Sequence, residues 1–311
     1  MVADSLRHCY VPAAERFHPQ IPSPMATSLA SQLLRIKPFV QGEAGGRKRP
    51  FTRPSVIFDP KEAADIDAET ILSIALSGLE VLIQADERFR RYKDTIFSHK
   101  SSDLDRETMV IEENKKIDAS IASYLRLLAG FLQLPSALKT LEYLIRRYKV
   151  HAYNVDELVL CALPYHDTHA FVRIVQVLEL GNKKWAFLEG IKASGAPPPR
   201  NVIVQQCIRD MGVLEDICNY AMPTNMFQQS RPVICFCSAV VVETLGAVPT
   251  LDTDIVKRIL PFAFAGLSSG RGASPDHKWN LAFFLTVIWT SSSSIPISFE
   301  REALEVPWSV N

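Results

Sequence analysis

The segment from Pro135 to Leu180 constrains the fold more than any other part of this chain. Apolar residues recur there at helical spacing, in short runs that prolines and turn residues separate. Helices this short are marginally stable alone, so neighbouring helices must bury their apolar faces. The segment therefore predicts stacked antiparallel helix pairs, the organisation of an α-solenoid. The two apolar stripes are Leu138, Leu141, Leu144, Ile145 and Tyr148, and then Phe171, Ile174, Val175 and Leu178.

A third short helix is expected between these two stripes. Asn154 stands at its N-cap position, and Glu157 follows three residues later as in a capping box. Pro164 closes the helix. Asp167 is expected to cap the next one, so Pro164 and Asp167 together would set the angle between successive helices.

The same spacing predicts further helices on both sides, and little period-two alternation appears, so we expect an all-α chain. Asp67 stands where it can cap the first of these helices. Asp210 and Glu215 are expected on the solvated face of a single helix that Asn201 opens. The predicted helices are Ala68 to Gln84, Ile117 to Leu132, one from Asn201 through Cys218, one from Pro232 and one from Asp254.

The chain divides into four parts by composition. Residues 1–24 are expected to be a disordered N-terminal extension, and residues 25–57 an N-terminal helix followed by a basic linker. Residues 58–270 form the predicted helical solenoid. Residues 271–311 are an atypical tail that lacks a capping helix, so we expect a truncated or altered C-terminus there.

Basic residues are clustered locally, although the whole chain has no net charge, with 34 Lys and Arg against 34 Asp and Glu. The loop Gly45 to Arg53 is either a phosphate-binding segment or a solvated linker. The run Arg146-Arg147-Tyr148-Lys149 repeats Arg90-Arg91-Tyr92-Lys93 and either contacts RNA or an acidic partner, or simply complements a helix dipole. The candidate contact residues are Arg47, Lys48, Arg49, Arg53, Arg146, Arg147 and Lys149.

The sequence contains no set of residues that indicates a catalytic site, so we interpret the chain as a scaffold. His166-x-x-His169, near Cys161, lacks the four ligands of a closed zinc site, so we interpret it as structural. Cys235 and Cys237 fall on different faces of a helix, and the six cysteines are typical of buried thiols in a reducing compartment. Nucleotide-binding and hydrolase motifs are absent. We therefore expect a non-enzymatic protein with neither cofactor nor metal.

Membrane insertion is not expected. The segment Trp279 to Ile297 is uncharged and long enough to consider, and a membrane-anchored helical protein is a third alternative. Its second half is too polar for us to interpret it as a span.

Several strings resemble the N-terminal region of one family, that of the large HEAT-repeat subunit of the small-subunit processome. This family includes HEAT-repeat-containing protein one and small nucleolar RNA-associated protein ten. The residues in these segments look most like those of its plant branch. The resemblance covers Met25 to about Leu267. It is carried by MATSLASQL from Met25, FDPKEAADID from Phe58, LEYLIRRYKVHAYN from Leu141, LPYHDTHAFVRIVQVL from Leu163 and CIRDMG from Cys207.

The resemblance implies an irregular HEAT or armadillo-like α-solenoid that acts as a nucleolar scaffold of the UtpA subcomplex. Its implied partners are the other UtpA subunits, processome proteins, the five-prime external spacer of pre-ribosomal RNA and the small nucleolar ribonucleoprotein. The implied role is processing toward 18S RNA, with a link to ribosomal DNA transcription. Family members are far longer than this chain. The alternative is a generic HEAT or armadillo adaptor for protein interactions in transport or signalling.

Overall fold

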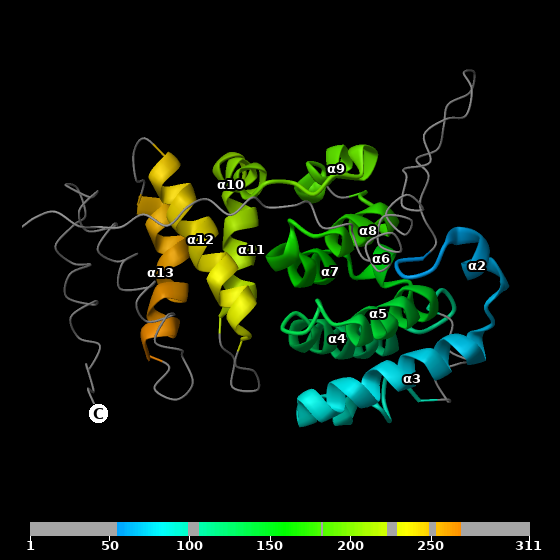
Figure 1. The fold of residues 1–311 in the computed structure, drawn as a ribbon. Helices are drawn as coiled ribbons and strands as arrows, with labels where there is room; N and C mark the ends of the chain where they lie inside the picture. Colours follow the sequence, from blue (N-terminus) through cyan, green and yellow to red (C-terminus); the bar gives the residue numbers. More distant parts are fainter. Residues whose placement is uncertain (1–54, 99–105, 182, 223–228, 249–252, 269–311) are drawn as a thin grey trace, which may run out of the picture. The chain divides into compact units, whose positions relative to one another are not determined.

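The structure is a computed structural model that describes residues 55–98, 106–181, 183–222, 229–248 and 253–268. These residues form helices and no strand, which confirms the predicted all-α, solenoid-type fold (Figure 1). The α-helices are α2 (Pro60–Asp65), α3 (Ala68–Ala85), α4 (Ile111–Leu128), α5 (Pro135–Tyr148), α6 (Val150–Tyr153), α7 (Val155–Ala162), α8 (His169–Val177), α9 (Leu188–Ser194), α10 (Arg200–Arg209), α11 (Met211–Ala221), α12 (Arg231–Ala247) and α13 (Thr253–Ser268). The 3-10 helices are η1 (Glu87–Tyr92), η3 (Leu163–Tyr165) and η4 (Lys183–Trp185).

The longer helices bury their apolar stripes against other helices, most of them two or three elements away in the sequence. Helix α3 packs on α5, α4 on α7, and α7 on α8 and α11. Farther along, α10 packs on α12, while α11 lies against both α12 and α13. One continuous apolar core results, and it contains all four residues of the stripe from Phe171 to Leu178. This is how short helices gain the stability that none has alone.

The contact between α3 and α5 depends on a glycine. A Cβ atom built at Gly78 would lie 2.7 Å from the carbonyl oxygen of Ser136 and 3.1 Å from the Cβ of Lys139. Any side chain at position 78 would therefore push the two helices apart.

Among the described helices, α3 is the one that is long and apolar enough to cross a membrane. Its buried residues, which include Leu79 and Leu82, belong to the protein core, and it packs on α5. We therefore interpret α3 as a core helix.

Polar side chains tie the helices together at their ends. The Nη2 atom of Arg126, on α4, lies 2.9, 2.8 and 2.9 Å from the carbonyl oxygens of Asn219, Tyr220 and Met222. These carbonyls belong to the last turn of α11, where helical partners run out. Arg126 thus satisfies the C-terminus of a helix that lies more than 90 residues away in the sequence.

The predicted helix starts are partly right. Asp67 caps α3, because its Oδ1 accepts a hydrogen bond of 2.7 Å from the Thr70 amide. The interaction with the Thr70 side chain, and then this backbone bond, lower the pKa of Asp67. Asn154 does occupy the N-cap position of α7, but its side chain makes no capping bond, so the capping box with Glu157 is not formed. Instead, the Asn154 side chain accepts a hydrogen bond from Arg106 and donates one to Asp118.

Two other sequence-based expectations are wrong. Thr168, and not Asp167, caps α8, with its Oγ1 3.3 Å from the Phe171 amide nitrogen, while Asp167 is exposed. Asp210 does not lie within a helix on a solvated face. It breaks the expected single helix into α10 and α11 and caps α11 through Gly212, whose amide nitrogen lies 2.9 Å from its Oδ1.

Candidate binding surface at the end of helix α5

The predicted contact residues fall into two groups. Arg47, Lys48, Arg49 and Arg53 lie outside the described residues, as do the expected terminal extension and tail. Arg146, Arg147 and Lys149 lie at the C-terminal end of α5. The structure therefore gives surroundings only to the second group.

Arg146 is engaged inside the protein. Its Nε donates to Oε1 of Glu142 at 2.9 Å, and its Nη2 donates to the Ala63 carbonyl at 2.7 Å. The other carboxylate oxygen of Glu142, which is buried, accepts the Val56 amide at 2.7 Å. The Arg146 and Glu142 pair thus anchors the segment that leads into α2, a role that its sequence pattern did not reveal.

Lys149 ends α5 in a left-handed conformation, with φ 49°. Its exposed ammonium forms an ion pair with Glu107, which lies in the turn before α4. Arg147, two residues earlier in the last turn of α5, is half-buried. Of the three residues, Lys149 presents its charge most directly to solvent.

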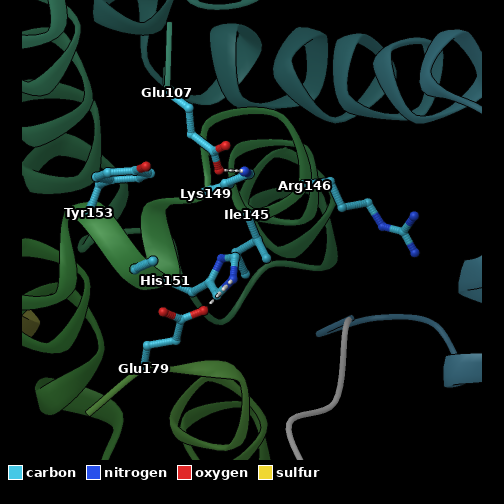
Figure 2. A pocket seen from close by; sticks show the side chains of 8 residues that line it. Glu107, Ile145, Arg146, Lys149, His151, Tyr153 and Glu179 are labelled. Carbon is cyan, nitrogen blue, oxygen red and sulfur yellow. Dashed lines mark hydrogen bonds and ion pairs between the residues drawn. The ribbon is translucent and has the colours of Figure 1, made fainter. Parts of the chain in front are cut away.

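Arg146 and Lys149 border a cavity of about 630 Å³. Figure 2 shows Glu107 and Lys149 on one side, Glu179 opposite them, and His151 between. The remaining lining residues are Ile145, Arg146, Ala152 and Tyr153. The walls come from the turn before α4, the end of α5, helix α6 and the segment after α8.

A buried arginine holds this cavity in shape. The side chain of Arg106 is only 2% exposed. Its Nη1 donates to the Tyr148 carbonyl at 3.1 Å and to Oδ1 of Asn154 at 2.9 Å, and its Nη2 pairs with Asp118. Arg106 therefore fixes the junction of α5, α6 and α7 to α4.

Arg106 also positions an aromatic wall. Its guanidinium carbon lies 4.5 Å from the ring centroid of Tyr153, which remains 49% exposed. Sequence reasoning missed Arg106, because nothing in its local pattern distinguishes it from an ordinary surface arginine in a charged segment.

The carboxylate of Glu179 faces a histidine that is mainly neutral. Nε2 of His151 lies 3.8 Å from Oε1 of Glu179 (Figure 2). Burial lowers the pKa of His151 below its usual value, and this effect outweighs the nearby Glu179 charge, which acts in the opposite direction. The imidazole therefore contributes little positive charge near neutral pH.

The histidine pair that the sequence singled out lies elsewhere and is not gathered into a ligand set. Nδ1 of His166 lies 2.9 Å from the Pro198 carbonyl oxygen, and the ring packs on Phe236, whereas His169 is exposed. Within the described ranges, no three His, Cys, Asp or Glu side chains lie close enough together to hold a metal ion.

The buried cysteine thiols of these helices are expected to react poorly as nucleophiles. Cys161 and Cys207 are buried, and burial raises the pKa of each to about 12. Cys237 is buried and Cys235 is exposed, as expected for two residues on different helix faces. Thiols held neutral in this way are poor nucleophiles.

No family model matches this sequence. An uncharacterized protein from Arabidopsis thaliana is 61% identical over 246 residues, which cover 79% of this chain. HEAT repeat-containing protein 1 from Danio rerio is 36% identical over 258 residues, or 78% of this chain. U3 small nucleolar RNA-associated protein 10 from Pyricularia oryzae is 35% identical over 226 residues, or 71% of this chain. The matched regions span 11%, 12% and 12% of these three relatives, which are much longer proteins.

Proposed function

Because most of this chain is homologous to HEAT repeat-containing protein 1 and U3 small nucleolar RNA-associated protein 10, we propose that it is a non-enzymatic helical scaffold of ribosome biogenesis. The observation that carries this proposal is the match to both kinds of relative over more than two thirds of the chain. A stack of helices whose stripes are buried between neighbours presents long outer surfaces, which suit the binding of partners more than chemistry.

The finer form of the proposal places the chain in the nucleolus, within the UtpA subcomplex of the small-subunit processome. Its partners there are other UtpA subunits, the five-prime external spacer of pre-ribosomal RNA and the U3 small nucleolar ribonucleoprotein. The name of the Pyricularia relative supports the association with U3 RNA. The role is processing toward 18S RNA, with a link to ribosomal DNA transcription.

RNA contact in this proposal comes from the basic residues near Ser55, where the described part of the chain begins. Val56 is held on Glu142, one helical turn from Arg146. Contacts would be mainly to phosphate and would weaken steeply with salt. The predicted contact residues are Arg47, Lys48, Arg49, Arg53, Arg146, Arg147 and Lys149. Because Arg146 and Lys149 already pair with Glu142 and Glu107, the four residues of the basic loop carry the proposed phosphate contact.

The test is recovery of RNA with the tagged full chain from plant nuclear extract, measured as U3 and pre-ribosomal RNA relative to messenger RNA. We expect enrichment of both RNAs together with processome proteins. Recovery of transport or signalling partners without either RNA would favour the generic adaptor and contradict the scaffold proposal.

A matched pair of variants tests the RNA contacts separately, with purified chain and a fragment of the external spacer. Alanine at Arg47, Lys48, Arg49 and Arg53 should weaken binding and reduce its dependence on salt. The control removes four exposed lysines elsewhere, and unchanged affinity in the first variant would exclude the basic loop as the contact. The control positions are Lys61, Lys115, Lys116 and Lys257.

A further inference from the structure

The cations that line the cavity at the end of α5 already have carboxylate partners. Lys149 pairs with Glu107 (Figure 2), and Arg146 pairs with the buried Glu142. Arg106, behind the wall, pairs with Asp118. A polyanion entering here would have to displace these carboxylates.

Glu179 is the lining carboxylate without a matching positive charge. Its side chain is 63% exposed, and its single ion-pair neighbour within the described ranges is His151, at 3.8 Å. Lys192, on α9, points its ammonium at the Leu178 carbonyl at 2.6 Å and lies within 4.0 Å of no described carboxylate. Among the lining residues, Glu179 is therefore the charged group that no Lys or Arg side chain pairs with in the described ranges.

Tyr153 adds an aromatic surface to the same wall. The ring is half-exposed, and Arg106 and the neighbouring helix junction hold it in place. Because the charge of Arg106 is matched by Asp118, the ring still offers its exposed surface to another cation. Tyr153 and Glu179 line the same cavity. An aromatic ring and a carboxylate together favour a planar cation, because a guanidinium can stack on the ring and donate hydrogen bonds to the carboxylate.

We propose that this cavity is a docking site for an arginine side chain of a protein partner, with Glu179 accepting the guanidinium and Tyr153 packing against it. The exposed carboxylate of Glu179 complements a basic segment of protein and repels the phosphates of RNA. Half-exposed tyrosine is also typical of the residues that dominate protein interfaces. Arg106 serves as the positioning residue.

This inference rests on the scaffold role only in taking the partner to be a protein. The test of the arginine site needs no ribosomal component, so failure of arginine binding would leave the proposed function standing. Failure to recover U3 or pre-ribosomal RNA would likewise leave the arginine site standing.

The test uses the full chain and a labelled nine-residue peptide with blocked ends, in which glycine and serine separate three arginines. Fluorescence anisotropy measures its affinity against the same peptide with citrulline, which keeps the shape and removes the charge. We expect the arginine peptide to bind more tightly. Glu179→Gln and Tyr153→Ala should each weaken it about two- to fivefold, because exposed ion pairs and cation-π contacts are worth up to about 1 kcal/mol. Glu189→Gln, at an exposed position on α9, is the matched control and should bind as the unmodified chain does.

Lys149→Gln distinguishes a protein partner from RNA by the sign of its effect. The substitution releases Glu107, so affinity for the arginine peptide should rise. A nine-nucleotide oligouridylate provides the opposing probe. Equal binding of the citrulline peptide, unchanged binding by Glu179→Gln, or oligouridylate binding that Lys149→Gln abolishes would each overturn the proposal.

Discussion

The guanidinium of Arg106 donates a hydrogen bond of 2.9 Å to the side chain of Asn154, which lies 48 residues farther along the chain. The same guanidinium donates to the Tyr148 carbonyl and pairs with Asp118. One buried side chain therefore joins α4 to the junction of α5, α6 and α7, and the cavity beside that junction depends on it.

Replacing Arg106 by leucine should destabilise the protein by about 2–3 kcal/mol, because buried polar groups that lose a charged partner pay a desolvation cost. Urea denaturation measures the free energy of unfolding. Arg209→Ala, at an exposed position on α10, is the control and should change it by less than about 0.5 kcal/mol. Equal effects of the two substitutions would show that Arg106 does not hold the junction.

Gly78→Ala should destabilise the protein by about 1–3 kcal/mol, although alanine is the better helix former. The added Cβ would lie 2.7 Å from the Ser136 carbonyl oxygen, so α3 and α5 must separate. Gly190→Ala is the matched control in α9, where a Cβ meets nothing within 4 Å. That substitution should be neutral or stabilising by up to about 1 kcal/mol. Thermal denaturation gives the sign of each change, and a stabilising Gly78→Ala would contradict the close helix contact.

Thr168→Ala should cost about 1 kcal/mol through the lost cap of α8. Asp167→Ala should cost less than about 0.5 kcal/mol, because Asp167 is exposed and makes no cap. The comparison uses the free energy of unfolding in urea. A larger loss for Asp167→Ala than for Thr168→Ala would restore the assignment made from sequence.

Stability should fall as pH drops below about 6.5, the usual pKa of a histidine in the unfolded chain. Burial lowers the pKa of His151 in the folded protein, so the unfolded state binds more protons in the window between the two pKa values. Stability is therefore fully retained above this window and is lost as pH falls through it. His151→Gln should flatten the pH dependence measured between about pH 7.5 and 5.5. The exposed His169, changed to glutamine, is the control and should leave the dependence intact. Identical pH dependence in the two variants would mean that His151 is not held neutral by burial.

The apolar stripes of α5 and α8 were predictable because helical periodicity is a local property. Leu141, Leu144, Phe171 and Ile174 are all buried, as their spacing indicates. The same holds for Asp67, whose capping bond reaches only three residues ahead. The relationship to HEAT-repeat proteins was likewise visible in short strings of residues, and the comparisons bear it out.

Only the tertiary structure decided how polar side chains were shared among competing partners. Asn154 has the sequence position of a helix cap, but distant Arg106 and Asp118 use its side chain instead. Arg146 has the pattern of a surface cation, but it donates hydrogen bonds to Glu142 and to the Ala63 carbonyl in α2. The physical reason is that a buried polar group must find partners wherever the fold places them. Apolar periodicity depends only on neighbouring turns of one helix. The polar contacts of Asn154 and Glu142 instead join residues that are 36 to 86 positions apart in the sequence, so no local pattern predicts them.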